Sequence, residues 1–173
     1  IDDRAAALNG GCYQHIPPEV RRQAISECKS FIETHIRGGV SFAVETTLRD
    51  GAAIEQAREA RSRGFMTLMT YVATDDVDEN IRRVTARGSG GGHSAPASVL
   101  RLVYDGSLSH LPEAIRVFDS VALFDASKRA GPDDLTRPVL IARIVNGKAR
   151  IRRRSLPAWV RRALEAAGMI TRS

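Results

Sequence analysis

The sequence is poor in cysteine and lacks the signals of secretion and of membrane insertion. Its two cysteines, Cys12 and Cys28, form no C-x-x-C pattern and have no cluster of metal ligands around them. Such sparse cysteine is typical of a reduced, cytoplasmic setting. No apolar run approaches the length of a membrane span, and no secretory signal is present. We therefore expect a cytoplasmic protein without membrane contact.

What the chain does have is the length and composition of a globular domain. Its 173 residues, 43% of them hydrophobic, are enough for a proper core and exclude fibrous and disordered classes. We treat residues 1–173 as a single domain. The net charge of +6 favours anionic partners, either nucleotides or nucleic acid. Much of the excess is near the C-terminus, at Arg150, Arg152, Arg153, Arg154, Arg161 and Arg162.

Apolar runs alternate with amphipathic segments along most of the chain. Buried strands are predicted at 40–48, 66–73 and 120–125. Helices are predicted at 18–38, 51–63, 76–87 and 112–118, with another helical stretch beginning at 94–96. This alternation predicts a parallel sheet covered by helices on both faces.

The C-terminal segment 138–168 differs in kind. Val139–Val145 and Lys148–Arg154 flank Asn146-Gly147, which is a strong signal for a two-residue hairpin turn, and a short helix is expected at 156–167. The arginines of this hairpin are interpreted as an exposed edge that discourages sheet pairing. Nucleic-acid binding is the less favoured interpretation, because no aromatic stacking platform accompanies the charge.

The segment F-A-V-E-T-T-L, Phe42 to Leu48, places a carboxylate in a predicted buried strand. A buried carboxylate is costly unless it is paired or binds something. In open parallel sheets, ligands bind beyond the carboxyl ends of the strands, which is where Glu45 falls. Glu45 is therefore a candidate substrate-binding group; the alternative is that it caps a loop or pairs with a structural arginine.

A second candidate site combines arginines with a glycine loop. Arg83 and Arg87 are four residues apart, on one face of a predicted helix, and Arg101 follows a loop at 88–92. Guanidinium groups beside such a loop match phosphoryl oxygens and stabilise their charge during transfer. The alternative for this region, about 76–111, is an ordinary solvated basic helix.

Four stretches, in this order, carry a resemblance to a known family. They are Asp2 to Leu8, Phe42 to Leu48, the set Arg83, Val84, Arg87, Gly91, Gly92, His93 and Pro96, and a downstream part made of Val99 to Arg101, Tyr104, Ser107, Leu108, Leu111, Pro112 and Leu123 to Ser127. With these motifs the chain resembles the zeta-toxin-like P-loop kinases over residues 1 to about 127. The resemblance implies a P-loop NTPase-type parallel sheet of order 2-3-1-4-5 with helices on both faces.

The resemblance also implies roles for residues on the acceptor side. Asp2 takes the place of the family's general base, which accepts the proton of the substrate hydroxyl. Asp3 is the alternative if the alignment shifts by one residue. Glu45 takes the place of the glutamate that holds the acceptor, assisted by Thr46 or Thr47.

On the nucleotide side, the resemblance assigns contacts with the ATP phosphates to Arg87 and Arg101, and less firmly to Arg83. His93 takes a position that stabilises the lid loop, and Mg²⁺ accompanies ATP. Ala126 stands where the family usually has asparagine, which puts an adenine-side contact there in doubt.

One departure from the family is serious. The 173 residues contain no G-x-x-x-x-G-K-[ST] phosphate loop, and Gly90-Gly91-Gly92 has no lysine or hydroxyl at the required spacing. In the family this loop precedes the position of Asp2, and the chain opens on Ile1 rather than methionine. We therefore expect the 173 residues to belong to a longer protein that carries the loop.

Three hypotheses for function follow. The leading one is an ATP-dependent kinase that phosphorylates a hydroxyl of a small molecule, for example of the nucleotide sugar UDP-N-acetylglucosamine, with an antitoxin protein as a further partner. The second is a kinase that processes nucleic-acid ends, favoured only by the basic C-terminal segment. The third is a catalytically inactive binding or regulatory domain, favoured by the absent phosphate loop.

Overall fold

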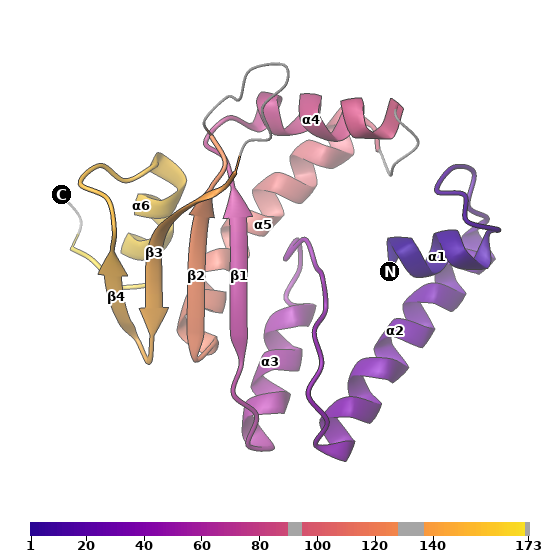
Figure 1. The fold of residues 1–173 in the computed structure, drawn as a ribbon, viewed down its shortest axis with the longest axis horizontal. Helices are drawn as coiled ribbons and strands as arrows, with labels where there is room; N and C mark the ends of the chain where they lie inside the picture. The colour runs from indigo at the N-terminus through magenta and orange to yellow at the C-terminus, as the bar shows by residue number, and fades with distance from the viewer. Residues whose placement is uncertain (90–94, 128–136, 172–173) are drawn as a thin grey trace. The chain divides into compact units, whose positions relative to one another are not determined.

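The computed structural model describes residues 1–89, 95–127 and 137–171 (Figure 1). The chain divides into two compact units, each described by itself below. Unit 1 comprises Ile1–Glu45 and Ile81–Leu100, and unit 2 comprises Thr46–Asn80 and Arg101–Ser173. None of the described helices has both the length and the apolar character needed to cross a membrane.

Unit 1 contains helices α1 (Asp2–Leu8) and α2 (Pro18–Gly38) and most of α4 (Val77–Ser89). Pro18 begins α2, because its fixed φ suits the first helical turn. Gly39 ends it in the left-handed conformation, φ 67°, and its N–H bonds to the carbonyl of Ile36. The buried small residues Ala5 and Ala24 lie on α1 and α2, which contact each other.

Unit 2 is built around a four-stranded sheet of order β1-β2-β3-β4. The strands are β1 (Leu68–Ala73), β2 (Ser120–Asp125), β3 (Val139–Val145) and β4 (Lys148–Ile151). β1 and β2 are parallel, with Ala73 opposite Asp125, whereas β3 and β4 are antiparallel to their neighbours. The protein is therefore α/β with a mixed sheet. The described strands do not form the parallel sheet that was predicted.

Three further helices complete unit 2: α3 (Ala52–Ser62), most of α5 (Ala97–Val117) and α6 (Ala158–Ala166). Large side chains from α5, α6 and the sheet form its core, each at most 1% exposed: Leu111, Ile115, Leu123, Ile144 and Trp159. Burying each of them contributes about 1.5–3 kcal/mol relative to leaving it in water. The core thus fixes α5 and α6 on the sheet.

Several predicted elements are confirmed. The third predicted strand coincides with β2, and Asn146 (φ 48°) and Gly147 (φ 73°) form the hairpin turn between β3 and β4. The two helical stretches predicted around 94–118 form one helix, α5, with Pro112 inside it. α4 runs through Ser89, so the predicted loop begins later than Gly88, and its residues 90–92 lie outside the described residues.

The predicted strand at 40–48 is wrong. These residues form no helix or strand, and Val40 and Val44 are 53% and 47% exposed. An apolar, β-branched segment becomes a strand only when another strand satisfies its backbone N–H and C=O groups. In the sheet that the structure describes, residues 40–48 have no such pairing.

Candidate functional site

The carboxyl ends of the parallel strands β1 and β2 are joined to the start of α6. Pro157 precedes α6 and provides no side-chain cap for its first turn. The carboxylate of Asp75, just beyond β1, accepts the N–H groups of Ala158 (2.9 Å) and Trp159 (2.8 Å) instead. A carboxylate at this end also complements the helix dipole. Asp75 therefore caps a helix that is remote from it in sequence.

Asp125, the last residue of β2, completes the same network. Its Oδ1 accepts the hydroxyl of Ser127 (2.7 Å) and the indole N–H of Trp159 (3.1 Å). The Ser127 hydroxyl in turn accepts the N–H of Asp75 at 3.0 Å. We call Asp75, Asp125, Ser127 and Trp159 the carboxyl-end cluster. Its polar groups bind one another, so the strand ends are held at a fixed separation.

Two tyrosines attach α5 to β1. The Tyr104 hydroxyl donates to the carbonyl of Thr74 at 2.6 Å, and Tyr71 shares a 2.8 Å hydrogen bond with Ser107. Burial raises the pKa of Tyr71 to about 12. Burial, and then the charge of Asp75, raise the pKa of Tyr104. Both phenols therefore remain protonated at neutral pH and act as hydrogen-bonding attachments of the helix.

Among the arginines expected to contact phosphate, Arg101 belongs to this region. It precedes Tyr104 by one helical turn, so both lie on the same side of α5, toward the end of β1. Its guanidinium pairs with Asp78 in the first turn of α4, and both side chains are largely exposed, at 49% and 68%. An exposed pair of this kind contributes little stability, so Arg101 can exchange Asp78 for another anion at low cost.

Thr46 and Thr47 belong to unit 2 and are exposed. The Thr46 hydroxyl accepts the N–H of Leu48 at 3.2 Å, which makes a local turn. Leu48 has a left-handed backbone, φ 54°, yet is only 3% exposed and belongs to the core. The next residue passes close to α5: a Cβ on Gly106 would lie 2.7 Å from the carbonyl oxygen of Arg49.

The remaining candidates belong to unit 1. Asp2 lies in the first turn of α1 and accepts a hydrogen bond from Arg21 at 3.3 Å. Asp3, the alternative base, accepts the hydroxyl of Tyr13 at 2.7 Å, and this bond raises the pKa of Tyr13. Both carboxylates begin a helix, where the dipole favours negative charge.

Glu45 is exposed, so the expectation of a buried carboxylate at this position is wrong. The segment around it is not covered by strand pairing in the described sheet, and its backbone and side chain therefore reach solvent. Glu45 is therefore a candidate substrate-binding group through its motif and not through the cost of burial.

Arg83 and Arg87 lie on α4, four residues apart, as predicted; Arg83 is partly buried and Arg87 is exposed. His93, assigned to the lid loop, lies outside the described residues. Asp2 contacts Arg21, Thr46 contacts Leu48 and Arg101 contacts Asp78. None of these three partners is itself a candidate site residue.

Sequence reasoning missed the roles of Asp75 and Trp159. The predicted helix at 76–87 accounts for Asp76, which caps α4 through the N–H groups of Asp78 (2.9 Å) and Glu79 (3.0 Å), but it gives no role to Asp75. A signal for Asp75 exists in the sequence: Pro157 leaves α6 without a cap of its own, which implies an acceptor from elsewhere.

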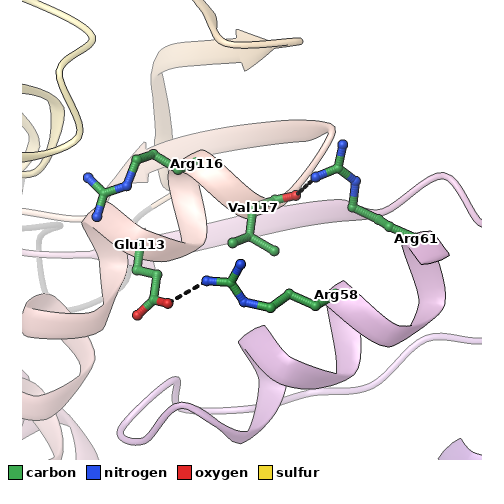
Figure 2. Close-up of a pocket in the computed structure, with 5 residues that line it drawn as sticks. All are labelled: Arg58, Arg61, Glu113, Arg116 and Val117. Carbon is green, nitrogen blue, oxygen red and sulfur yellow. Dashed lines mark hydrogen bonds and ion pairs between the residues drawn. The ribbon is translucent and has the colours of Figure 1, made fainter.

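A hollow of about 500 Å³ lies at the opposite end of α5 (Figure 2). It is lined by Arg58, Arg61, Glu113, Arg116 and Val117. Arg58 pairs with Glu113 at 2.6 Å, and Arg61 donates to the Val117 carbonyl at 2.7 Å, as Figure 2 shows. Arg116 donates to the Ala166 carbonyl at 2.9 Å. These guanidinium groups already bind protein acceptors, so the hollow is best explained as a rim of structural ion pairs.

Comparison with known proteins gives a limited result. No protein-family model matches the chain, and no solved structure matches it. An uncharacterized protein of Haemophilus influenzae (strain ATCC 51907 / DSM 11121 / KW20 / Rd) is 29% identical over 83 residues. The match covers 48% of this chain and 56% of that protein, so the chain spans little more than half the length of this relative.

Proposed function

We propose that the chain provides the acceptor and lid parts of an ATP-dependent kinase, which transfers the γ-phosphate to a hydroxyl of a small molecule. The observation that carries the proposal is the position of Arg101. This arginine precedes by one helical turn Tyr104, which bonds to Thr74 beyond the carboxyl end of β1, where α/β proteins bind ligands, and among the described residues it forms an exposed pair with Asp78. It is also the arginine that the motif order assigns to the ATP phosphates.

A second line of support is the helical conformation of α4. Arg83 and Arg87 lie four residues apart on a helix that leads into the expected lid loop. In phosphoryl transfer, positively charged groups around the phosphates supply most of the protein's contribution. The proposal therefore assigns Arg87 and Arg101 to the transferred phosphoryl group and Arg83 to a supporting role.

The proposal also includes the sheet order 2-3-1-4-5. In it, β1 and β2 correspond to the fourth and fifth strands, which are parallel neighbours. β1 is the end strand of the described sheet, so its outer backbone groups can pair with a further strand, and the exposed Leu68 (67%) and Val72 (50%) form an apolar face that suits a covering layer of helices. The proposal requires a phosphate loop, and the 173 residues contain none, so it must come from outside them.

The acceptor side is assigned by the motif roles of four residues. Asp2 would accept the hydroxyl proton and Glu45 would bind the acceptor, with Thr46 or Thr47 assisting. UDP-N-acetylglucosamine is the acceptor to test first. Mg²⁺ in such sites is held by phosphate oxygens, water and one or two carboxylates, so the proposal assigns it no cluster of protein ligands. Within the described residues, no three His, Cys, Asp or Glu side chains form such a cluster.

Transfer of labelled phosphate from ATP tests the proposal. The protein is produced with the residues encoded upstream of Ile1 and is incubated with Mg-ATP and a panel of nucleotide sugars, nucleosides and 5′-hydroxyl oligonucleotides. We expect transfer to a small-molecule hydroxyl. Asp2→Asn should retain ATP binding in calorimetry and lose most of the transfer, because the base acts only on the reacting hydroxyl.

Glu45→Gln separates acceptor binding from folding. It should weaken acceptor binding by about 1.5–3 kcal/mol, the value of a charge-assisted hydrogen bond, and leave ATP binding nearly unchanged. Equal losses for both ligands would indicate a structural Glu45. Full activity of Asp2→Asn would refute the assignment of the base. Failure of the extended protein to bind ATP would favour the inactive binding domain instead.

A further inference from the structure

The cations of the β3–β4 hairpin lie on one exposed face. In the hairpin register Arg143 is opposite Arg150, and Val145 is opposite Lys148. Because side chains alternate along a strand, Lys148 and Arg150 point to the same side as Arg143. All three are exposed, whereas Ala142 and Ile144, on the other side, belong to the core with Trp159 of α6. The cationic face is therefore the one that α6 does not cover.

The row of cations continues beyond β4. The N–H of Arg152, the residue just beyond β4, donates to the carbonyl of Ile141 at 2.8 Å, and the Arg152 side chain is exposed. Arg153 and Arg154 follow and are also exposed. We call Arg143, Lys148, Arg150 and Arg152 the hairpin cation row.

The arrangement costs stability, and no acidic side chain among the described residues offsets this cost. Like charges directly opposite each other on neighbouring strands are destabilising. None of the four cations forms an ion pair with an acidic side chain in the part of the chain that the structure describes. The arginines of α3, by contrast, pair with Glu55, Glu113 and Asp119.

Protection of the sheet edge explains only part of this row. Charged residues on an edge strand discourage pairing with other chains, which suits β4. Arg143, however, lies on β3, which pairs with β2 on one side and β4 on the other. An interior strand needs no protection of this kind, so edge protection does not account for Arg143.

We propose that the hairpin cation row binds the phosphodiester backbone of a nucleic acid. Alternate residues of a strand lie about 6.8 Å apart. The phosphates of one nucleic-acid strand follow a winding path that is longer than the axial rise of about 3.4 Å per nucleotide, so Lys148 and Arg150 can each meet a separate phosphate. Val145 and Ile151, the exposed large apolar side chains of the hairpin, are aliphatic and offer no ring for base stacking. The binding is thus to backbone and independent of base sequence.

This inference is separate from the proposed kinase activity. It assigns a binding surface and no reaction on the nucleic acid, and either proposal can fail without the other. It also revises the interpretation from sequence, in which the hairpin arginines were only a solvated edge, because the register places a cation on an interior strand.

Fluorescence anisotropy tests the surface. The probes are a 20-nucleotide RNA strand and a 20-base-pair DNA duplex, each titrated with protein at several KCl concentrations. The variant R143Q/K148Q/R150Q is compared with R22Q/K29Q/R37Q, which removes three exposed cations from α2 and changes the net charge equally. Removal of like charges should leave the melting temperature of the hairpin variant unchanged or raised.

We expect the hairpin variant to bind about tenfold or more weakly at low salt, with the slope of log K against log[KCl] reduced by about 2 on the RNA strand. The α2 variant should keep most of the affinity and the slope. Equal losses in both variants, or no binding to either probe, would overturn the proposal. Loss of binding to phosphatidylserine vesicles, with nucleic-acid binding unchanged, would assign the row to a lipid surface instead.

Discussion

The two ends of the parallel pair β1–β2 both use carboxylates, but they connect different partners. At the carboxyl end, Asp75 and Asp125 bind the first turn of α6 and the indole of the buried Trp159. At the amino end, the carboxylate of Asp119 accepts the N–H of Thr67 at 2.8 Å and the hydroxyl of Thr67 at 2.9 Å. It also pairs with Arg61 at 3.0 Å.

The difference lies in what each network holds. Asp119 comes directly before β2 and Thr67 directly before β1, so their bonds close the start of two strands that are already neighbours. The carboxyl-end cluster joins the two strands to a helix from the far end of the chain. The carboxyl end thus attaches an element from the far end of the chain, whereas the amino end closes two neighbouring strands and pairs with Arg61 of α3.

The largest effect on stability should come from Trp159→Ala. Removing a fully buried indole leaves a cavity and should lower the free energy of unfolding by about 3–5 kcal/mol, measured by urea denaturation. Trp159→Phe keeps a ring but loses the bond to Asp125, and should cost less. A loss under about 1 kcal/mol in the alanine variant would contradict a carboxyl end built on this residue.

Arg101 and Arg116 provide a matched pair on one helix. Arg101→Ala should lower the turnover of the proposed kinase by about 10³-fold, because an arginine at the transferred phosphoryl group acts mainly on charge that develops in the transition state. Arg116→Ala, at the other end of α5, loses only its bond to the Ala166 carbonyl and should leave turnover unchanged. Equal turnover in the two variants would make Arg101 a surface residue.

Asp75 and Asp76 separate the remote helix cap from the local one. Asp75→Ala should cost about 1–2 kcal/mol, because it leaves two N–H groups of α6 without their acceptor. Asp76→Ala removes the cap of α4 and should cost about 1 kcal/mol. Differential scanning calorimetry of both variants measures the difference, and an unchanged melting temperature for Asp75→Ala would mean that water replaces the carboxylate without cost.

The smallest effect concerns the amino end and depends on pH. The N–H of Thr67, and then its hydroxyl and Arg61, lower the pKa of Asp119. A carboxylate whose folded pKa is lowered contributes stability above its unfolded pKa of about 3.9, and loses it as the pH falls through the folded value. Asp119→Asn should therefore cost about 1 kcal/mol at pH 7, and this difference should shrink below about pH 4.

Local signals in the sequence predicted much of the fold. The apolar run within Ser120–Asp125, the helix start at Pro18 and the turn at Asn146-Gly147 each depend on residues close together in the chain, and each was confirmed. Strand pairing is not local. An apolar run such as 40–48 has the composition of a strand, yet composition carries no information on whether a partner strand lies beside it.

The candidate site was less predictable for the same reason. Arg83, Arg87 and Arg101 could be selected because guanidinium groups near a glycine loop indicate phosphate chemistry. The exposure of Glu45 could not be predicted, because burial depends on what covers the segment. The bonds from Asp75 to Ala158 and Trp159 join residues far apart in the chain, and two consecutive aspartates do not reveal which of them caps a distant helix.

Gly106 has a consequence for how the Thr46–Thr47 segment is held. A glycine inside a helix costs roughly 0.5–1 kcal/mol relative to alanine, so its presence in α5 calls for a compensating gain. The compensating gain is room for the Arg49 carbonyl oxygen, which lies next to the position that a Cβ of residue 106 would occupy. The conformation of the threonine segment therefore depends on the absence of a side chain at Gly106, which lies in a helix more than fifty residues later in the chain. Sequence changes at Gly106 would reshape this segment while leaving its own residues untouched.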